Sequence, residues 1–290
     1  MSINRVFVIG AGLMGHGIAQ VSAAAGKQVT LSDRTRDLAE KGKTRIGSNL
    51  ARQVEKGKLD EADADQILGR VTTTAGAEAA EGHDLVIEAV FEDEPLKRET
   101  LAALTMAAGP DTIFASNTSS ISITALATAT DRPSRFIGLH FFSPVPVMKL
   151  IEIIRGLETD DATYQACRGF AEELGKTVIE SRDMPGFLVN RMLGPFINEA
   201  VFALMESTGT AEDIDTGARL GLNHPMGPLE LSDFIGNYVM LGVMDVLHRG
   251  FGDPKFRAAP LLRQMVTAGH LGRKTGRGFY RYDEKGNKVG

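Results

Sequence analysis

Two ionisable side chains, one in each of two apolar segments, could act together as a general base. His140 closes the apolar run 136–139, and Glu152 lies inside the apolar run 150–154. A carboxylate is costly to bury without a partner, so the two residues are expected to pair. Glu152 would then fix the ring tautomer and stabilise the imidazolium formed on protonation, as the oxidation of an alcohol requires. The alternative is a structural histidine and a glutamate at a sheet edge.

A run of polar residues, Ser116 to Ser120, directly follows the apolar segment 113–115. Open α/β sheets bind ligands beyond the carboxyl ends of their strands, so these hydroxyls could hold a substrate oxygen or a cofactor. Serine and threonine are also preferred helix N-caps, and a helix is expected to begin near residue 121. One hydroxyl could therefore cap that helix while another contacts a ligand.

A third polar cluster, residues 185–191 (Pro-Gly-Phe-Leu-Val-Asn-Arg), lies where the strand pattern ends. The junction of two domains is a common place for a binding cleft. Asn190 could donate a hydrogen bond to a substrate carbonyl, and Arg191 could bind a phosphate or simply brace the domains.

The elements that must position these groups begin with a strand that leads into a glycine motif and then a helical pattern. This is the context that dinucleotide binding requires. Gly10 allows a tight turn, Gly12 lets the backbone approach a pyrophosphate, and Gly15 lets the helix pack close to the strand. The alternative is a glycine-rich turn in an ordinary βαβ unit. The cofactor-binding residues expected in this motif are Gly10, Ala11, Gly12, Leu13, Met14 and Gly15.

Asp33 ends the next predicted strand, residues 29–32. An acidic side chain at this position accepts hydrogen bonds from the ribose hydroxyls of an adenosine. Its charge disfavours the 2′-phosphate of NADP, whereas the neighbouring Arg34 could pair with that phosphate. The sequence therefore favours NAD over NADP.

The 290 residues exceed the usual size of one domain, and their pattern divides them into two domains. Residues 1–185 alternate strands and helices, which predicts a Rossmann-like, doubly wound, mostly parallel sheet with helices on both faces. A charged helical hairpin at 37–68, broken near Gly57, is inserted after the second strand.

Residues 186–290 are predicted to form an all-α domain. Helices are expected at 187–205, 211–220 and 229–247, and a strand at 278–280. The first of these helices is apolar on all sides, which favours burial in a homodimer interface.

The net charge of −5, without a basic stripe, argues against nucleic acid or an anionic membrane as a partner. No apolar run approaches the roughly 18 residues of a membrane span, and the early first strand predicts no signal peptide. The single cysteine, Cys167, cannot form an internal disulfide, which fits a cytoplasmic location. Cys167 is predicted to be a packing residue, and no metal site is expected.

The polar blocks together resemble the 3-hydroxyacyl-CoA dehydrogenase family, in particular its short bacterial 3-hydroxybutyryl-CoA members. Each block alone is common, but the set follows the order and spacing of the family across nearly the whole chain. The matching segments are the glycine motif at 10–15, the hydroxyl run at 116–120, and residues 140–146, 185–191, 224–228 (His-Pro-Met-Gly-Pro) and 274–280 (Lys-Thr-Gly-Arg-Gly-Phe-Tyr).

The resemblance implies roles for four residues around the reacting carbon. His140 resembles the catalytic base of the family, and Glu152 resembles the electrostatic partner of that base. Ser119 resembles the serine that contacts the substrate hydroxyl and the cofactor. Asn190 resembles the asparagine that holds the substrate.

The resemblance also implies contacts to the cofactor and to coenzyme A. Glu92 and Lys97 match residues that line the nicotinamide-side ribose, and Lys274 matches a lysine near the cofactor. Lys56 falls where the helical hairpin of the family offers a lysine to a phosphate of coenzyme A. Ser143 stands where the family usually has asparagine, so a shorter side chain would face the nicotinamide.

The implied reaction is the reversible, NAD-dependent oxidation of a short-chain (S)-3-hydroxyacyl-CoA to the 3-oxoacyl-CoA by a cytoplasmic homodimer. Two alternatives are a dehydrogenase of a free 3-hydroxy acid or of carnitine, and a non-catalytic NAD(H)-binding protein. The first would not depend on Lys56. The second would bind the cofactor, yet His140→Ala would change no turnover.

Overall fold

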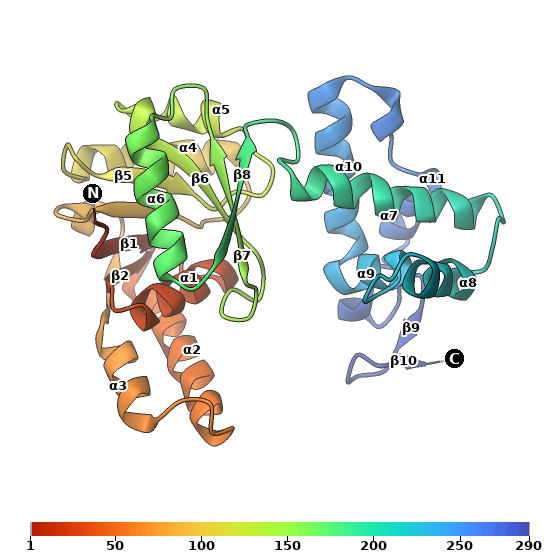
Figure 1. Cartoon of the computed structure of the whole chain (residues 1–290), viewed down its shortest axis with the longest axis horizontal. Coiled ribbons are helices and arrows are strands. Elements are labelled where there is room, and N and C mark those ends of the chain that lie inside the picture. Colours follow the sequence, from red (N-terminus) through yellow and green to blue (C-terminus); the bar gives the residue numbers. More distant parts are fainter. Residues whose placement is uncertain (1, 290) are drawn as a thin grey trace. The chain divides into compact units, whose positions relative to one another are not determined.

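The computed structural model describes residues 2–289, and the chain divides into two compact units, Met1–Asp183 and Met184–Gly290 (Figure 1). This division lies close to the boundary at 185/186 expected from the sequence. Each unit has its own hydrophobic core.

The first unit is built on a single eight-stranded sheet. Its strands are β1 (Arg5–Ile9), β2 (Gln28–Asp33), β3 (Val71–Ala75), β4 (Leu85–Glu88), β5 (Ile113–Ser116), β6 (Phe136–Phe141), β7 (Leu150–Arg155) and β8 (Thr177–Arg182). Their order in the sheet is β3-β2-β1-β4-β5-β6-β7-β8, and neighbours are parallel except β6 and β7, which are antiparallel. The prediction of a Rossmann-like, mostly parallel sheet is therefore confirmed.

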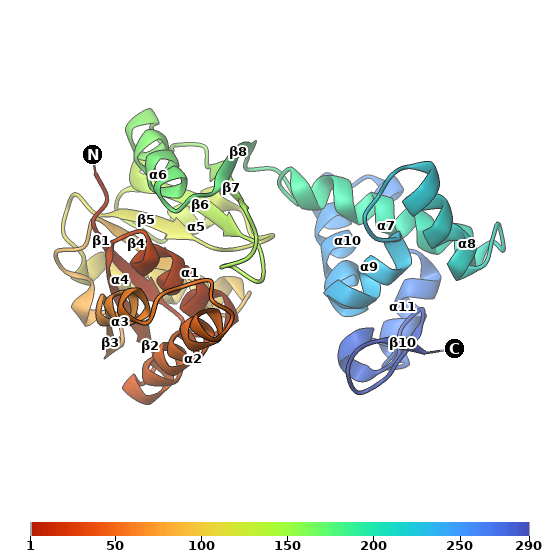
Figure 2. The ribbon, with the colours of Figure 1, turned by 60° about the horizontal axis from the view of Figure 1, so that its bottom comes forward.

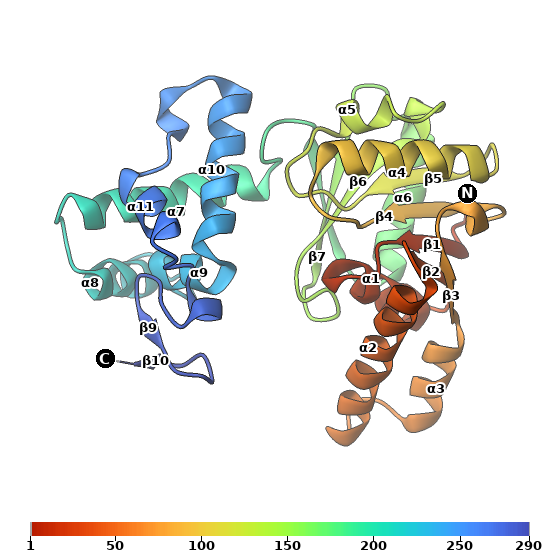
Figure 3. The same ribbon diagram turned by 180° about the vertical axis from the view of Figure 1, so that it is seen from behind.

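Helices cover both faces of this sheet. They are α1 (Leu13–Ala24), α2 (Arg36–Glu55), α3 (Glu61–Gly69), α4 (Glu94–Ala107), α5 (Ile123–Ala127) and α6 (Asp161–Glu173), with 3₁₀ turns at Glu78–Ala80 and Pro133–Arg135. The helices α1 and α6 lie over one face, in front in Figure 1, and α4 and α5 lie over the other face, which Figure 3 shows in front.

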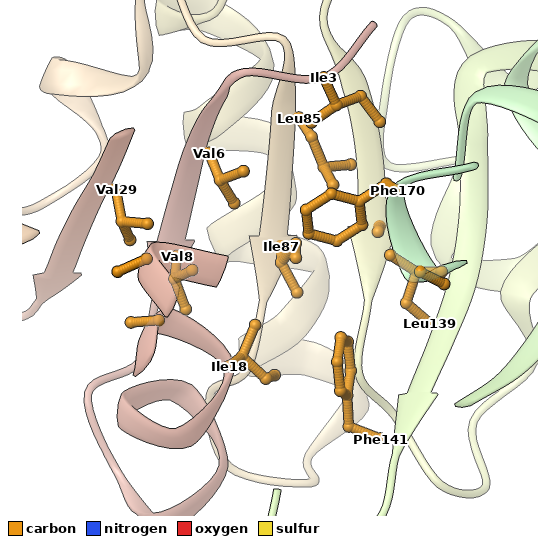
Figure 4. Close-up of a cluster of buried hydrophobic side chains, with 14 of the residues drawn as sticks. Ile3, Val6, Val8, Ile18, Val29, Leu85, Ile87, Leu139, Phe141 and Phe170 are labelled. Carbon is orange, nitrogen blue, oxygen red and sulfur yellow. The ribbon is translucent and has the colours of Figure 1, made fainter. Parts of the chain in front are cut away.

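Alternate side chains of the strands form the core beneath α1 and α6. Val8 and Ile87 point into this core, where Phe170 of α6 joins them (Figure 4). Because successive strand residues face opposite sides, Phe7 and Val86 belong to the face covered by α4 and α5. This alternation decides which polar side chains meet at the end of the sheet.

Cys167, the single cysteine, belongs to the core on the α6 side. Its side chain has no exposed surface, and burial raises the pKa of the thiol to about 12. The prediction that it is a packing residue is confirmed.

The predicted helical hairpin is formed by α2 and α3, which lie side by side and extend beyond the sheet (Figures 1 and 2). The helix α2 begins after Thr35, whose hydroxyl caps it by accepting from Leu38 N. It ends just before Gly57, whose φ of +64° lies in the left-handed region that favours glycine. Lys56 is therefore exposed at the turn between the two helices.

The second unit is mainly helical, as predicted. Its elements are α7 (Val189–Met205), α8 (Ala211–Thr216), a π-helical turn (Gly217–Gly221), α9 (Pro228–Ile235), α10 (Asn237–Phe251), α11 (Pro260–Thr267), 3₁₀ turns at Pro254–Phe256 and Arg273–Thr275, and the antiparallel strands β9 (Arg281–Tyr282) and β10 (Lys288–Val289). None of the helices within residues 2–289 is both long and apolar enough to span a membrane.

Three boundaries predicted for this unit were wrong. The single helix expected at 229–247 is two helices, because Gly236 has φ +111° and ends α9. The helix expected from residue 187 begins at Val189, since Gly186 and Phe187 both have positive φ. The strand expected at 278–280 lies at Arg281–Tyr282.

Two further helical segments also differ from the sequence prediction. The helix expected at 211–220 ends as an α-helix at Thr216 and continues as the π-helical turn. The helix α11, which begins with Pro260 in its first turn, was not predicted.

Candidate active site

The register of four neighbouring strands gathers polar side chains on one face at the end of the sheet. Glu88 of β4 lies opposite Ser116 of β5, and Ser116 lies opposite Gly138 of β6. His140, two residues after Gly138, faces the same side, and it pairs in register with Glu152 of β7. This face is opposite to the one that carries Val8 and Ile87, so the polar groups do not enter that core.

His140 and Glu152 form a buried pair, as the sequence predicted. His140 Nδ1 lies 3.0 Å from Glu152 Oε2, and their side chains are 8% and 0% exposed. The ring of Phe142 packs on His140 at a centroid distance of 4.4 Å. The cross-strand register therefore explains why residues twelve positions apart in sequence are in contact.

Hydrogen bonds from a lysine side chain hold the loop that joins β6 to β7. Lys176 Nζ donates to the carbonyl oxygens of Val145 and Met148, both at 2.7 Å. The same loop packs closely on α1, where a Cβ at Gly17 would lie 2.8 Å from Val145 Cβ. Ser143 is exposed in this loop, three residues after His140 in the chain.

The hydroxyl run after β5 converges on one carboxylate. Glu92 Oε1 accepts from Thr118 Oγ1 at 2.6 Å, Ser119 N at 2.9 Å, Ser119 Oγ at 3.2 Å and Ser120 Oγ at 3.0 Å. Burial raises the pKa of Glu92, but the charge of Lys97 and these hydrogen bonds outweigh it, so the net pKa is lowered. The site therefore presents an ionised carboxylate at neutral pH.

The role of helix cap, which was the alternative for the hydroxyl run 116–120, belongs to a residue just outside that run. Ser122 is the N-cap of α5, and its hydroxyl accepts from Ala125 N at 3.1 Å. The carboxylate of Asp183 satisfies two further N–H groups of this turn, those of Ile123 and Thr124. Ser119 is therefore not needed as the cap.

Sequence reasoning missed one residue of this site, Glu88. Its side chain is fully buried and accepts from Ser116 Oγ at 2.6 Å, Val90 N at 2.8 Å and Lys97 Nζ at 2.8 Å. Because Val90 N bonds to this carboxylate, β4 stops at Glu88, two residues before the end of the apolar run. The signal was present, since a glutamate inside an apolar strand is the same feature that singled out Glu152.

Lys97 differs from the expectation that it lines a ribose. Its side chain is only 1% exposed, and Nζ contacts Glu88, Glu92 and the carbonyl oxygen of Val90. Lys97 is thus enclosed by protein groups, whereas the side chain of Glu92 is 37% exposed. The structure therefore places Glu92 at the surface of the site and Lys97 behind it.

The glycine turn has the space that a dinucleotide needs. Gly10 has φ +97°, and a Cβ there would lie 2.5 Å from Ala89 O. A Cβ at Gly15 would lie 1.6 Å from Gly10 O, whereas a Cβ at Gly12 would meet no heavy atom within 4 Å. Gly10 and Gly15 close the turn, whereas Gly12 leaves open space at the N-terminus of α1, where pyrophosphate would bind.

Asp33 lies beside this turn, as predicted for a ribose acceptor. Its Oδ2 accepts from Ala11 N at 2.8 Å, and its Oδ1 accepts from Arg34 N at 2.7 Å. The carboxylate is only partly buried, so it can also bond to a ligand. The residues present therefore fit NAD.

The remaining predicted residues lie in the second unit. Asn190 is half-buried in the first turn of α7, and Lys274 is exposed in the 3₁₀ turn Arg273–Thr275. Arg191 stacks on Phe251 and Phe256, with ring-centroid distances of 4.4 and 4.2 Å. Of the two roles considered for Arg191, these contacts favour bracing, here within the second unit.

Both units of the chain match known sequences of one family. Residues 5–184 match the 3-hydroxyacyl-CoA dehydrogenase NAD-binding domain, and residues 186–282 match the C-terminal domain of the same family. The chain belongs to the 3-hydroxyacyl-CoA dehydrogenase family.

Several 3-hydroxyacyl-CoA dehydrogenases are similar over nearly the whole length. The 3-hydroxybutyryl-CoA dehydrogenase of Bradyrhizobium diazoefficiens is 51% identical and covers 97% of this chain and 96% of the relative. The probable 3-hydroxybutyryl-CoA dehydrogenase of Bacillus subtilis is 49% identical, with 98% and 99% covered. The crystal structure of the (S)-3-hydroxybutyryl-CoA dehydrogenase of Ralstonia eutropha has a TM-score of 0.95 and 49% identity, with 98% of this chain and 100% of that chain covered.

Membership of the 3-hydroxyacyl-CoA dehydrogenase family confirms three predictions made from the sequence. The chain is an oxidoreductase of the NAD-dependent 3-hydroxyacyl-CoA dehydrogenase class, its cofactor is NAD, and its first unit has the NAD-binding fold. The roles of individual side chains stay predictions.

The glycine turn gives a prediction that separates binding from folding. We expect Gly12→Ala to weaken NADH binding at least tenfold, because the new methyl group would occupy the space for pyrophosphate. Its melting temperature should stay near that of the wild type, since the methyl group meets no protein atom. NADH fluorescence titration and thermal unfolding measure the two effects.

Substitutions at two other glycines serve as controls for this experiment. Gly15→Ala should lower both affinity and melting temperature, because its Cβ overlaps Gly10 O. Gly169→Ala in α6 should lower neither the NADH affinity nor the melting temperature, because no heavy atom lies within 4 Å of the new Cβ. Unaltered NADH affinity in Gly12→Ala would show that pyrophosphate does not approach this turn.

Proposed function

We propose that this 3-hydroxyacyl-CoA dehydrogenase reversibly oxidises (S)-3-hydroxybutyryl-CoA to acetoacetyl-CoA with NAD. The observation that carries the proposal is the buried pair of His140 and Glu152, 3.0 Å apart near the carboxyl end of β6. The choice of substrate is supported by relatives at 51% and 49% identity whose names specify 3-hydroxybutyryl-CoA.

His140 acts as the base through Nε2. An ionised Glu152 can only accept, so the Nδ1 that it contacts carries the ring proton and Nε2 presents its lone pair. Nε2 takes the proton of the 3-hydroxyl, and the Glu152 charge stabilises the imidazolium that results. When bound, NAD supplies the nicotinamide ring that accepts the hydride released from C3. In the reverse direction His140 returns the proton to the 3-oxo oxygen.

Four side chains of the chain are proposed to orient the reactants. Ser119 contacts the substrate hydroxyl, and Glu92 faces the nicotinamide-side ribose with its exposed part. Lys97 does not touch the ribose in this proposal; it holds Glu92 from behind. Ser143 offers a hydroxyl to the nicotinamide in place of an amide.

The roles of two residues in the second unit rest on the resemblance to the family. Asn190 is proposed to hold the substrate through a hydrogen bond from its amide. Lys274 is proposed to lie near the cofactor, where its exposed ammonium group could interact with the phosphates.

Lys56 is proposed to bind a phosphate of coenzyme A. We expect Lys56→Ala to raise KM for acetoacetyl-CoA roughly fivefold with kcat unchanged, because an exposed charge contact contributes modestly to binding. Lys41→Ala is the matched control, since Lys41 is an exposed lysine at the other end of α2. An unchanged KM in Lys56→Ala would assign the phosphate to other groups.

The substrate class is tested by comparing oxidation rates with NAD. The enzyme is expected to oxidise (S)-3-hydroxybutyryl-CoA at least a hundredfold more efficiently than free 3-hydroxybutyrate or carnitine, because the CoA moiety supplies binding energy that orients the acyl group. Equal efficiency with the free acid would contradict the proposal.

We also infer a homodimer formed through the C-terminal helices. Large apolar side chains of this unit are exposed in the single chain, among them Met192 at 61% and Phe234 at 56%. Light scattering is expected to give the mass of two chains, and a monomer would refute the inference. We assign the enzyme to the cytoplasm, where NAD and CoA thioesters are available.

A further inference from the structure

We propose that Glu88 is a positioning residue that acts on the cofactor and substrate through Glu92 and Ser119. Its carboxylate belongs to a ring of hydrogen bonds and one ion pair that joins the end of β4, the start of α4 and the hydroxyl run after β5. The inference rests on the proposed function, which places Glu92 and Ser119 in contact with the reactants.

The ring can be followed atom by atom. Ser116 Oγ donates to Glu88 Oε2 at 2.6 Å and accepts from Thr118 N at 3.2 Å. Thr118 Oγ1 donates to Glu92 Oε1 at 2.6 Å. Lys97 Nζ lies 3.3 Å from Glu92 Oε2 and donates to Glu88 Oε1 at 2.8 Å, which closes the ring.

The ring connects a buried group to an exposed one. Glu88 and Lys97 are 0% and 1% exposed, whereas the side chain of Glu92 is 37% exposed. Without these bonds an exposed glutamate would sample several rotamers, and binding would have to restrict it. Glu92 is held at both carboxylate oxygens, by hydrogen bonds on Oε1 and by the ion pair with Lys97 on Oε2, which restricts the orientation of the group.

The charges of the ring explain why Glu88 must be a carboxylate. Lys97 lies between two carboxylates, and the negative charge of Glu88 offsets the attraction between Lys97 and Glu92. A neutral amide at position 88 would leave Lys97 paired with Glu92 alone. It would also have to present N–H to Ser116, whose own hydroxyl would then turn away from its present direction. Both changes would move the carboxylate that holds Ser119.

The same carboxylate sets the conformation of the chain next to it. Val90 N donates to Glu88 Oε1 rather than to the β-ladder, so the chain leaves β4 toward Glu92 at this point. A group that only filled space would not need hydrogen bonds to β5, to α4 and to its own loop at once. The partners of Glu88 lie in or next to the segments that carry Glu92 and Ser119, the two proposed contact residues.

A double-mutant cycle on the full-length enzyme tests whether Glu88 acts through Glu92. We expect Glu88→Gln to raise the NADH dissociation constant about tenfold and to lower kcat for acetoacetyl-CoA, with Glu92→Gln giving losses of similar size. In the Glu92→Gln background, Glu88→Gln should change the NADH dissociation constant less than about twofold, because its target is already lost. Fluorescence titration reports binding without turnover.

Three outcomes would overturn the proposal. Losses that add fully in the double variant would show that the two residues act independently. An unchanged NADH affinity in Glu88→Gln, with only a lower melting temperature, would show a purely structural role. An unchanged affinity in Glu92→Gln would show that Glu92 does not contact the cofactor.

Two further variants keep the test decisive. Ser116→Ala opens the ring without a change of charge, so it replaces Glu88→Gln if that variant folds poorly, and the same non-additivity is expected. Glu99→Gln makes the same chemical change at an exposed position of α4 and should leave affinity unaltered. If the wild type binds NADH but does not reduce acetoacetyl-CoA, the proposed function is contradicted. The double-mutant cycle can still be measured in that case, because its readout is NADH binding.

Discussion

His140→Gln is expected to lower kcat for the reduction of acetoacetyl-CoA by roughly 10²- to 10⁴-fold, the range supplied by general acid–base catalysis. Glutamine keeps a polar side chain of similar length but cannot carry a proton to the 3-oxo oxygen. The residue lies in β6 with its side chain 8% exposed, so the change removes the acid without opening a large cavity. The rate is measured by the loss of NADH absorbance at saturating thioester.

The affinity for NADH distinguishes lost chemistry from lost structure in this variant. NADH binding should stay within about twofold of the wild type, because the glycine turn and Asp33 do not depend on His140. His248→Gln is the control, since His248 is an exposed histidine in the last turn of α10. A kcat near that of the wild type in His140→Gln would remove His140 from the mechanism.

Glu152→Gln is expected to lower kcat about a hundredfold or more, because the partner of a catalytic histidine sets its tautomer and stabilises its cation. The amide can donate to Nδ1 as well as accept from it, so part of the population would place the ring proton on Nε2. Glutamine is nearly the same size as glutamate, so this fully buried position should tolerate it sterically.

A second substitution at the same position separates charge from packing. Glu152→Asp keeps the negative charge but shortens the side chain, so it should retain more activity than Glu152→Gln if charge matters most. Equal losses in both variants, together with equal falls in melting temperature, would indicate that Glu152 serves only the packing of β6 against β7.

The pair of His140 and Glu152 could be predicted from the sequence, because burial of an unpaired carboxylate costs free energy and the sequence places Glu152 among apolar residues. A glutamate inside an apolar run needs a partner, and a histidine at the end of another apolar run is the nearest suitable group. The structure then adds what sequence spacing cannot give, namely the register that places His140 opposite Glu152. The same argument applied to Glu88 would have found the buried carboxylate that was missed.

The helical unit was harder to predict because single residues decide its boundaries. Gly236 interrupts an apolar pattern that otherwise continues from 229 to 247, and its φ of +111° lies in the region that favours glycine. Asn237, fully buried after it, bonds to Ser232, Asp233 and the carbonyl oxygen of His270. The contact with His270, 33 positions away, leaves no periodic signal in the sequence.

The burial of Lys97 is a further property that only the structure reveals. A lysine in the first turn and a half of a helix usually reaches solvent, and nothing in the local sequence shows that two carboxylates enclose it. The resemblance placed Lys97 at the ribose, whereas its contacts place it behind Glu92. We therefore propose that Lys97 acts on the cofactor through Glu92, and its role stays a prediction.

The proposed reaction is tested most directly by measuring NADH oxidation with acetoacetyl-CoA and with acetoacetate at the same concentration, for the wild type and for His140→Gln. We expect the wild type to turn over the thioester only, and His140→Gln to lose this activity. Turnover with the free acid would contradict the CoA thioester as substrate. Full activity of His140→Gln with acetoacetyl-CoA would contradict the role of the His140–Glu152 pair.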